Sequence, residues 1–293
     1  MSGELLILGL GYAGAAIARS ALEAGWSVRA ALRDPARAGL PGLAVLPFAR
    51  AGEALATATH LLAVAPPGED GDPALAAHGP AIAAAPALRW IGYLSTTGVY
   101  GDRAGGWVDE ATPPAPGSER ARRRLAAEGQ WAGLAGARAV DIFRLAGIYG
   151  PGRSAFDELR AGRARRVVRP GHCFGRIHRD DIARAVLAAA AEARGAGARI
   201  LNLADDEPAE SAAVVAEAAR LLGVPAPPEI PFAAAWESMS PMARSFWAEN
   251  RKVSSARTRA ALGLAWRYPT YREGLAAILA AERGEQIGEG QAQ

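Results

Sequence analysis

The sequence predicts an α/β protein built on a doubly wound parallel β-sheet and followed by a smaller C-terminal lobe. Short apolar runs, typical of buried strands, alternate with longer helical stretches from residue 4 to about residue 206. After Gly152 this alternation is interrupted by a basic segment and later by a proline-rich one. The chain has 293 residues, of which 50% are hydrophobic and 22% are charged, so it can bury a large core.

The first thirty residues predict a strand, a turn, a helix and a second strand. Residues 4–8 form a short run that is apolar without a break from Leu5 to Leu8, which indicates a strand that is covered on both faces. The turn GLGYAG, from Gly9 to Gly14, follows at once. A helix is expected over 15–24 and a strand over 26–32. A GxGxxG match in this setting is more specific than the same match alone, because the turn must join a strand to a helix.

This glycine turn indicates a dinucleotide-binding Rossmann domain. Gly9 permits the tight turn, Gly11 lets backbone amides approach a pyrophosphate, and Gly14 lets the helix pack closely against the strand. The helix N-terminus adds unpaired N–H groups and a partial positive charge. Tyr12, in the turn, and Ala65, at the end of a later strand, complete the predicted cofactor site. The alternatives are a turn without a ligand and a flavin or S-adenosylmethionine site.

The end of the second strand bears on the choice of cofactor. An acidic side chain at this place would hold the ribose hydroxyls of NAD, but the sequence reads Leu32-Arg33-Asp34. Arg33 falls nineteen residues after Gly14. A guanidinium suits a 2′-phosphate, so NADP is favoured over NAD. Alternatively, Arg33 is a solvated loop residue and Asp34 contacts the ribose.

The alternation continues after this unit. The expected strands are 43–46, 60–65, 90–95, 139–145 and 200–203, and the expected helices are 74–85, 118–134 and 180–194. Residues 163–177 are expected to form a basic turn or hairpin around Pro170 and Gly171.

The predicted domains follow from these elements. A Rossmann domain covers 1–152 and is completed by about 178–206. A smaller substrate-binding lobe is formed by 153–177 and 207–284, and a polar tail covers 285–293.

Several segments, taken together, resemble a known family. In chain order they are the glycine turn, 94–102 (LSTTGVYGD), 108–110 with the prolines at 113–114, 144–152 (RLAGIYGPG), 177–183 (IHRDDIA) and 202–208 (NLADDEP). With these six segments in this order, the chain resembles the extended short-chain dehydrogenase/reductase superfamily, in its NAD-dependent epimerase/dehydratase branch. The tight glycine loop and the STTGVYG segment are similar to the atypical YeeZ-like subgroup. The resemblance implies an active site between the cofactor domain and the lobe.

The resemblance also implies a catalytic group made of a Ser or Thr, a Tyr and a Lys four residues after the Tyr. Thr96 falls on the first position. The family's helix pattern places Arg120 at the Tyr position and Arg124 at the Lys position. With a pKa above about 12, an arginine does not readily transfer protons, although Arg124 can still bond the nicotinamide ribose. The one lysine of the chain, Lys252, has Ala248 four residues before it.

Three hypotheses follow from the missing Tyr–Lys pair. The first is an oxidoreductase or epimerase/dehydratase-like enzyme with another acid or base, in which Tyr100 joins Thr96 and Arg124 in the catalytic group. Further candidates, each with a structural alternative, are Asp102, Asp109, Glu110, His172 and His178. The second is a non-catalytic NADP-binding redox sensor or regulatory protein. The third is a basic module in which the arginines at 120 and 122–124 meet phosphate or an acidic protein, although a solvated helix face is the commoner explanation.

A second basic set lies where the family borders its substrate. Arg165, Arg169 and Arg176, with Arg166 beside them, suit an anionic substrate such as a nucleotide diphosphate sugar if they converge, because guanidinium groups pair well with phosphate. Salt bridges on a hairpin are the plainer alternative. The expected partners are therefore a nicotinamide cofactor and a small-molecule substrate, and the chain is compatible with a homodimer.

Composition argues against several other classes. The longest uncharged stretches are shorter than the roughly 18 residues of a membrane-spanning helix, and the N-terminus lacks the basic start of a secretory signal. One cysteine, Cys173, with four scattered histidines predicts no disulfide and no metal site. A cytoplasmic protein is therefore expected, without a membrane partner. The net charge of +3 reflects the arginine bias, so a nucleic acid partner is not expected.

Overall fold

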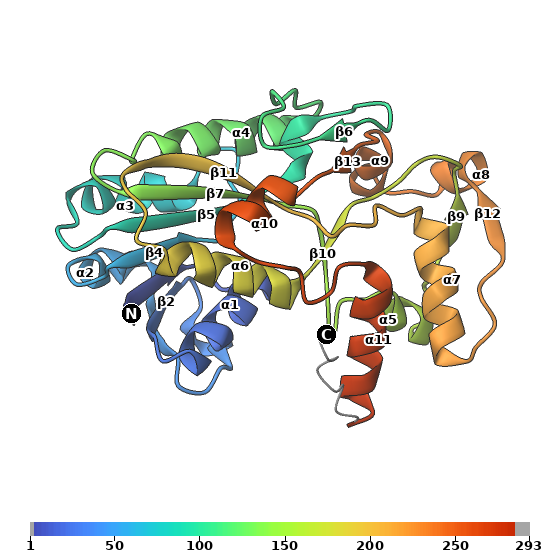
Figure 1. Cartoon of the computed structure of the whole chain (residues 1–293), viewed down its shortest axis with the longest axis horizontal. Helices are drawn as coiled ribbons and strands as arrows, with labels where there is room; N and C mark the ends of the chain where they lie inside the picture. The colour runs from blue at the N-terminus through green and yellow to red at the C-terminus, as the bar shows by residue number, and fades with distance from the viewer. Residues whose placement is uncertain (1–2, 285–293) are drawn as a thin grey trace.

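A computed structural model describes residues 3–284 of the chain. A seven-stranded sheet lies at its centre, in the order β11-β7-β5-β4-β1-β2-β3 (Figure 1). Each neighbouring pair of strands runs parallel. The strands are β1 (Glu4–Leu8), β2 (Ser27–Leu32), β3 (Ala44–Pro47), β4 (His60–Ala63), β5 (Trp90–Thr96), β7 (Ala139–Leu145) and β11 (Gly197–Leu203). The strand order runs outward from β1 in both directions, which confirms the predicted doubly wound Rossmann fold.

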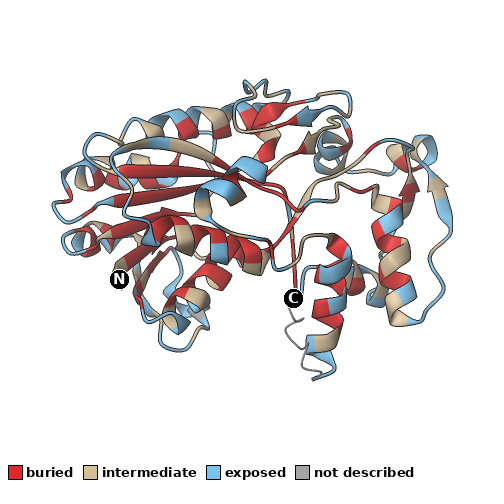
Figure 2. Ribbon diagram, viewed as in Figure 1, coloured by how far each residue is buried: buried red, intermediate tan, exposed pale blue. Residues whose placement is uncertain are grey.

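Helices cover both faces of this sheet (Figure 1). On one face lie α1 (Tyr12–Glu23) and α6 (Arg179–Ala191), and on the other lie α2 (Ala51–Leu55), α3 (Pro73–Ala84) and α4 (Glu119–Ala132). In β1, Leu5 and Ile7 enter the first hydrophobic cluster, whereas Leu6 and Leu8 enter the second. The unbroken apolar run of β1 is therefore explained by cover on both faces, and buried residues follow the strands in Figure 2.

The smaller lobe has two hydrophobic clusters of its own. One is formed mainly by α5 (Ala155–Arg160), α7 (Ser211–Leu222) and α11 (Tyr271–Glu282), which lie together at one end of the molecule (Figure 1). The other joins β9 (Arg166–Val168) and β12 (Glu229–Pro231) to α8 (Phe232–Glu237) and α9 (Pro241–Trp247).

Of the turn or hairpin expected at 163–177, the structure has a turn at 170–171 but no hairpin. β9 pairs in parallel with β12, and β10 (Arg176–His178) pairs in parallel with β8 (Gly147–Tyr149). Both partners are distant along the chain, so the turn at 170–171 does not join two paired strands. Local sequence cannot reveal such partners, because only the completed fold brings them together.

One stretch of the range predicted for the lobe packs with the sheet domain. β13 (Lys252–Val253) pairs with β6 (Trp107–Val108), and α10 (Ala256–Leu262) follows it. Val253 and Trp266 belong to the hydrophobic cluster that contains Leu5 and Ile7 of β1. The predicted tail, 285–293, lies outside the described residues. None of the helices in residues 3–284 combines the length and the apolar character that crossing a bilayer requires.

Three short 3-10 helices complete the described part of the chain. They are η1 (Pro35–Ala38), η2 (Phe48–Arg50) and η3 (Thr97–Tyr100).

Candidate active site

The glycine turn joins β1 to α1 at the carboxyl edge of the sheet. Gly9 has a φ of +90°, and a Cβ atom built there would lie 3.6 Å from the backbone nitrogen of Ala65. A Cβ atom on Gly14 would lie 3.3 Å from the Val64 side chain. Gly11, the N-cap of α1, provides no side-chain cap, and a Cβ atom there would meet nothing within 4 Å. The first N–H groups of α1 thus lack a side-chain cap, and the space beside Gly11 is open, as a bound phosphate requires.

Tyr12 connects this turn to the loop after β8. Its hydroxyl donates to the carbonyl oxygen of Pro151 at 2.9 Å, and the Arg179 guanidinium lies 5.0 Å from its ring centroid. Partial burial raises the pKa of the Tyr12 hydroxyl. Tyr12 therefore fixes the start of α1 against the neighbouring loop.

Arg33 and Asp34 follow β2 directly. Arg33 is exposed, and within residues 3–284 its side chain makes no hydrogen bond or ion pair. Asp34 caps η1, where its side chain accepts a hydrogen bond from the Ala36 amide at 3.2 Å. Of these two residues, the guanidinium is therefore the group with donors available to a ligand.

Arg124 lies on the face of α4 that packs against β5. Its side chain is buried, and Nη1 donates to the carbonyl oxygen of Leu94 at 2.8 Å and to the Tyr93 hydroxyl at 3.1 Å. Leu94 follows the last residue of β5 that pairs with β4, which is Tyr93. The guanidinium therefore lies at the carboxyl edge of the sheet. Arg120, on the same helix, is exposed.

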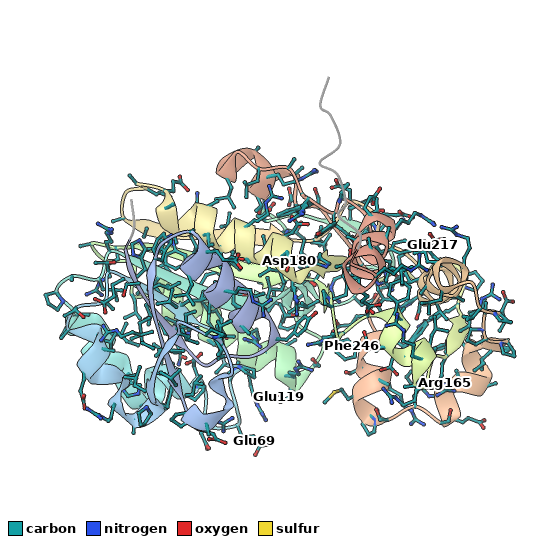
Figure 3. The ribbon with its side chains drawn as sticks, turned by 90° about the horizontal axis from the view of Figure 1, so that it is seen from below. Glu69, Glu119, Arg165, Asp180, Glu217 and Phe246 are labelled. Atoms are coloured by element: carbon teal, nitrogen blue, oxygen red, sulfur yellow. The ribbon has the colours of Figure 1, made fainter. Side chains whose placement is uncertain are left out.

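The other helix arginines belong to a charged surface. Arg122 and Arg123 both pair with Glu119, at 3.1 Å and 3.3 Å, and Arg123 also lies 3.7 Å from Glu69. Glu69 and Glu119 project from neighbouring parts of the surface in Figure 3. These ion pairs fit the interpretation of a solvated helix face, with Arg124 as the buried exception.

A cavity of about 350 Å³ lies at the carboxyl ends of β5 and β7. Its wall includes Thr96, Tyr149, Arg176, Phe246 and Arg251, which come from both the sheet domain and the lobe. Thr96 is the N-cap of η3, where its Oγ1 accepts from the Gly98 amide at 3.1 Å. The Thr96 hydroxyl can still donate its own proton to a substrate. We call this space the interdomain cavity.

Tyr100 does not line the interdomain cavity. It is fully buried, and its hydroxyl donates to Asn202 Oδ1 at 2.8 Å. The Arg144 guanidinium lies 4.7 Å from its ring centroid and forms a buried ion pair with Glu128 at 2.7 Å. Burial raises the pKa of the Tyr100 hydroxyl. The structure thus places Tyr100 in a polar network of the core, apart from Thr96 and Arg124.

The carboxylate candidates accept hydrogen bonds from other groups of the protein. Asp102 accepts from the Asn250 amide at 2.7 Å, which lowers the pKa of Asp102. Asp109 accepts hydrogen bonds within its own turn. Glu110 accepts from the Thr258 hydroxyl at 2.6 Å. None of the three carboxylates is among the described residues that line the interdomain cavity.

The histidine candidates are also buried outside that cavity. His172 stacks on Trp247 with a centroid separation of 5.2 Å, and burial lowers the pKa of His172 to about 4. Nδ1 of His178 accepts from the Asp180 amide at 3.2 Å, and burial lowers the pKa of His178 as well. Both rings are therefore neutral at physiological pH. Within residues 3–284 no group of three or more His, Cys, Asp or Glu side chains could hold a metal ion.

The three predicted substrate arginines do not converge. Arg165 donates to the Ser238 hydroxyl at 2.9 Å, on the surface of the lobe (Figure 3). Arg169 donates to the carbonyl oxygen of Trp247 at 2.5 Å. Arg176 alone among them lines the interdomain cavity. Arg165 and Arg169 bind instead to the end of α8 and to α9. The local sequence around 165–169 does not reveal these partners.

Sequence reasoning missed several residues of the cavity wall. Phe246, more than half exposed, enters from α9, and Arg251 forms an ion pair of 2.6 Å with Glu249, which also lines the cavity. The charge pair two residues apart was visible in the sequence. Its position beside Thr96 was not, because residues 96 and 251 meet only in the folded protein.

Comparisons with known proteins show which solved structures the chain is similar to. No family model and no curated protein matches the chain. Among solved structures, a functionally unknown conserved protein from Silicibacter pomeroyi DSS is 42% identical, with a TM-score of 0.88 over 96% of this chain and 99% of that chain. A protein from Methylobacillus flagellatus, provisionally assigned as an NAD-dependent epimerase/dehydratase, is 25% identical, with a TM-score of 0.73 over 97% of this chain and 100% of that chain.

The fold and the glycine turn define the class, a Rossmann-fold protein whose structural neighbours are NAD-dependent epimerase/dehydratase and extended short-chain dehydrogenase/reductase proteins. Within that class, the chain belongs to the same family as the Silicibacter pomeroyi protein. The superfamily prediction is therefore confirmed, and the YeeZ-like subgroup stays a prediction.

Two more distant neighbours share the fold and were solved with ligands. MoeE5, in complex with UDP-glucuronic acid and NAD, is 22% identical, with a TM-score of 0.75 over 96% of this chain and 100% of that chain. The human epimerase family protein SDR39U1, with NADPH, is 19% identical, with a TM-score of 0.73 over 94% of this chain and 98% of that chain.

Proposed function

We propose that the chain binds NADP in preference to NAD and acts as an oxidoreductase or epimerase/dehydratase-like enzyme on a small-molecule substrate, without the usual Tyr–Lys pair. The observation that carries this proposal is the uncapped glycine turn at the carboxyl edge of the sheet, on the same edge as the cavity that Thr96 lines. Open clefts at this edge are where α/β sheets of this kind bind their ligands.

The cofactor assignment depends on the charges around the turn. The N–H groups of α1 suit the pyrophosphate, and the donors of the Arg33 guanidinium suit a 2′-phosphate. Arg124 makes both of its hydrogen bonds through Nη1, so its other nitrogens can donate to the nicotinamide ribose. Bound NADP would supply hydride transfer. The neighbours bound to NAD and to NADPH support a nicotinamide cofactor in this fold.

The substrate is assigned to the interdomain cavity. The Thr96 hydroxyl would donate a hydrogen bond to a substrate oxygen, and Arg176 and Arg251 would favour an anionic group. A nucleotide sugar is one such substrate, as in the MoeE5 complex. Phe246 adds an apolar wall for the rest of the molecule.

A redox sensor is the second candidate. The observation in its favour is that Tyr100 is buried in the core and that Arg124 cannot exchange protons. Tyr149 lines the cavity, but its hydroxyl donates to the carbonyl oxygen of Thr270 at 3.4 Å, and burial and the nearby Asp205 raise the pKa of Tyr149 well above its usual range. With these groups alone, the chain would bind NADP and change shape without turnover.

The cofactor proposal is tested by titrating the protein with NADPH and NADH and following fluorescence. Arg33→Ala should weaken NADPH binding by about tenfold or more and leave NADH binding unchanged, because a charge-assisted hydrogen bond contributes roughly 1.5–3 kcal/mol. Arg19→Ala is the matched control, since Arg19 is an exposed arginine on α1. Equal weakening for both cofactors would contradict the 2′-phosphate assignment.

Turnover separates the enzyme from the sensor. NADPH oxidation is followed with a panel of small carbonyl acids. With nucleotide sugars and NADP⁺, the epimerised or dehydrated product is followed instead, because an epimerase or dehydratase returns its cofactor to the oxidised state in each turnover. Activity on any member supports the enzyme. Firm NADPH binding with no turnover across the panel favours the sensor.

A further inference from the structure

A second cavity, of about 410 Å³, lies in the smaller lobe. Its wall is built mainly by α5, α7 and α11, which lie together in Figure 1. It shares Tyr149 and Arg176 with the interdomain cavity and otherwise has different wall residues. Neither Thr96 nor any residue of the glycine turn lines it. We call it the lobe cavity.

Arg176 brings a positive charge to the lobe cavity. Its Nη1 donates to the carbonyl oxygens of Phe174 at 2.9 Å and Ala209 at 3.1 Å. Its guanidinium carbon lies 6.0 Å from the ring centroid of Tyr271, another wall residue of this cavity. No hydrogen bond from its other nitrogens connects to residues 3–284, so these donors remain available to an anion.

The N-terminus of α7 lies beside the Arg176 guanidinium. The helix has twelve residues, begins at Ser211 and lacks a side-chain cap. The carboxylate of its N-cap residue, Glu210, instead accepts from the Gly171 amide at 2.8 Å. Ala209, which binds Arg176, is two residues before Ser211, so the arginine and the first amides of α7 are close together. The N-terminus of a helix of this length carries a partial positive charge.

Tyr271 supplies an independent sign of a ligand. Its side chain is only 1% exposed, and its hydroxyl has no hydrogen-bond partner in the part of the chain that the structure describes. A buried hydroxyl without a partner is costly, and such groups are rare in folded proteins. An oxygen atom of a ligand in the lobe cavity would satisfy it.

The acidic residues around the lobe cavity do not cancel its charge. Asp157 is held by the amide and hydroxyl of Ser154, in a capping box. Glu158 pairs with Arg163 at 3.1 Å. Burial raises the pKa of Asp205, whose backbone amide bonds the Arg176 carbonyl, to about 8. The raised pKa weakens the negative charge that Asp205 sets against Arg176 at neutral pH.

We propose that the lobe cavity is a second binding site, which takes a small oxyanion ligand, a phosphate or a carboxylate, through Arg176, the N-terminus of α7 and the Tyr271 hydroxyl. The lobe cavity shares Arg176 with the proposed substrate site and differs from it in the donors of α7 and Tyr271. Its occupancy does not depend on NADP binding.

The test measures anion binding to the full chain without cofactor. Inorganic phosphate, succinate and UDP are titrated by calorimetry into the wild type, Tyr271→Phe, Arg176→Gln and the matched control Tyr268→Phe. Tyr268 is a partly exposed tyrosine of the same region that does not line the lobe cavity. The three anions distinguish a free phosphate, a carboxylate and a nucleotide phosphate as the source of the oxyanion.

Phosphate or succinate should bind the wild type and Tyr268→Phe equally, and Tyr271→Phe should weaken binding by about tenfold or more. Tyr271→Phe decides the outcome even if Arg176→Gln fails to fold, because the hydroxyl that it removes has no hydrogen-bond partner within residues 3–284. Unchanged affinity in Tyr271→Phe, or binding of UDP but of neither small anion, would overturn the proposal. NADPH titration of Tyr271→Phe should match the wild type, so a failure of this site is distinguishable from a failure of the proposed cofactor site.

Discussion

Replacing Asp205 with asparagine should change how the stability of this protein depends on pH. The Asp205 side chain is 1% exposed, and both of its carboxylate oxygens lack a hydrogen-bond partner within residues 3–284. Burial raises the pKa of Asp205 from 3.8 to about 8, while Arg176 opposes the rise. Between these two pKa values the folded protein therefore binds one more proton than the unfolded chain.

The size of the effect follows from proton linkage. Because the folded state binds the additional proton, the contribution of Asp205 to the free energy of unfolding falls by about 1.4 kcal/mol for each pH unit between pH 4 and pH 8. Over the whole window the loss is roughly 6 kcal/mol. Above pH 8 both states are ionised, and the Asp205 contribution no longer changes. Asparagine is neutral throughout and nearly the same shape, so Asp205→Asn removes this dependence.

The assay is urea unfolding of both proteins from pH 5 to pH 9. The stability of Asp205→Asn relative to the wild type should rise with pH up to about pH 8 and then level off. His60 and His172, whose pKa values burial lowers to about 4, titrate alike in both proteins, so their effect cancels in the difference. A stability difference that stays constant from pH 5 to pH 9 would refute the reasoning, since it would mean that Asp205 is ionised in the folded state.

Two further predictions concern packing. Glu128→Ala should destabilise the protein by roughly 3–5 kcal/mol in urea unfolding, because it leaves the buried Arg144 guanidinium without its 2.7 Å partner; a loss below about 1 kcal/mol, the value of an exposed pair, would contradict this. Gly274→Ala should lower the free energy of unfolding by about 1–3 kcal/mol, because its Cβ would lie 2.0 Å from the Tyr149 hydroxyl oxygen. The control is Gly129→Ala in α4, whose Cβ would meet nothing within 4 Å and which should stabilise the protein by about 1 kcal/mol. If both alanines stabilise, the close packing of α11 on Tyr149 is wrong.

The sequence by itself determined the central sheet. The mainly apolar segments at 4–8 and 139–145 form β1 and β7 with the predicted bounds, because a strand covered on both faces has a local signature. The glycines from Gly9 to Gly14 likewise predicted where the chain passes from β1 into α1. A tight turn and a close helix approach need glycine at those places, whatever the rest of the chain does.

Only the tertiary structure decided which side chains share a site. Thr96 and Arg251 line one cavity although they are 155 positions apart, whereas Arg165 and Arg176 are near in sequence and face different surroundings. Tyr100 follows Thr96 by four residues and is nevertheless buried against Asn202. The physical reason is that strand and helix patterns are local, while the contacts of polar side chains depend on long-range packing and burial. The single lysine and the arginine at 124 are properties of the sequence, but the buried hydrogen bonds of Arg124 at the edge of β5 are a property of the fold.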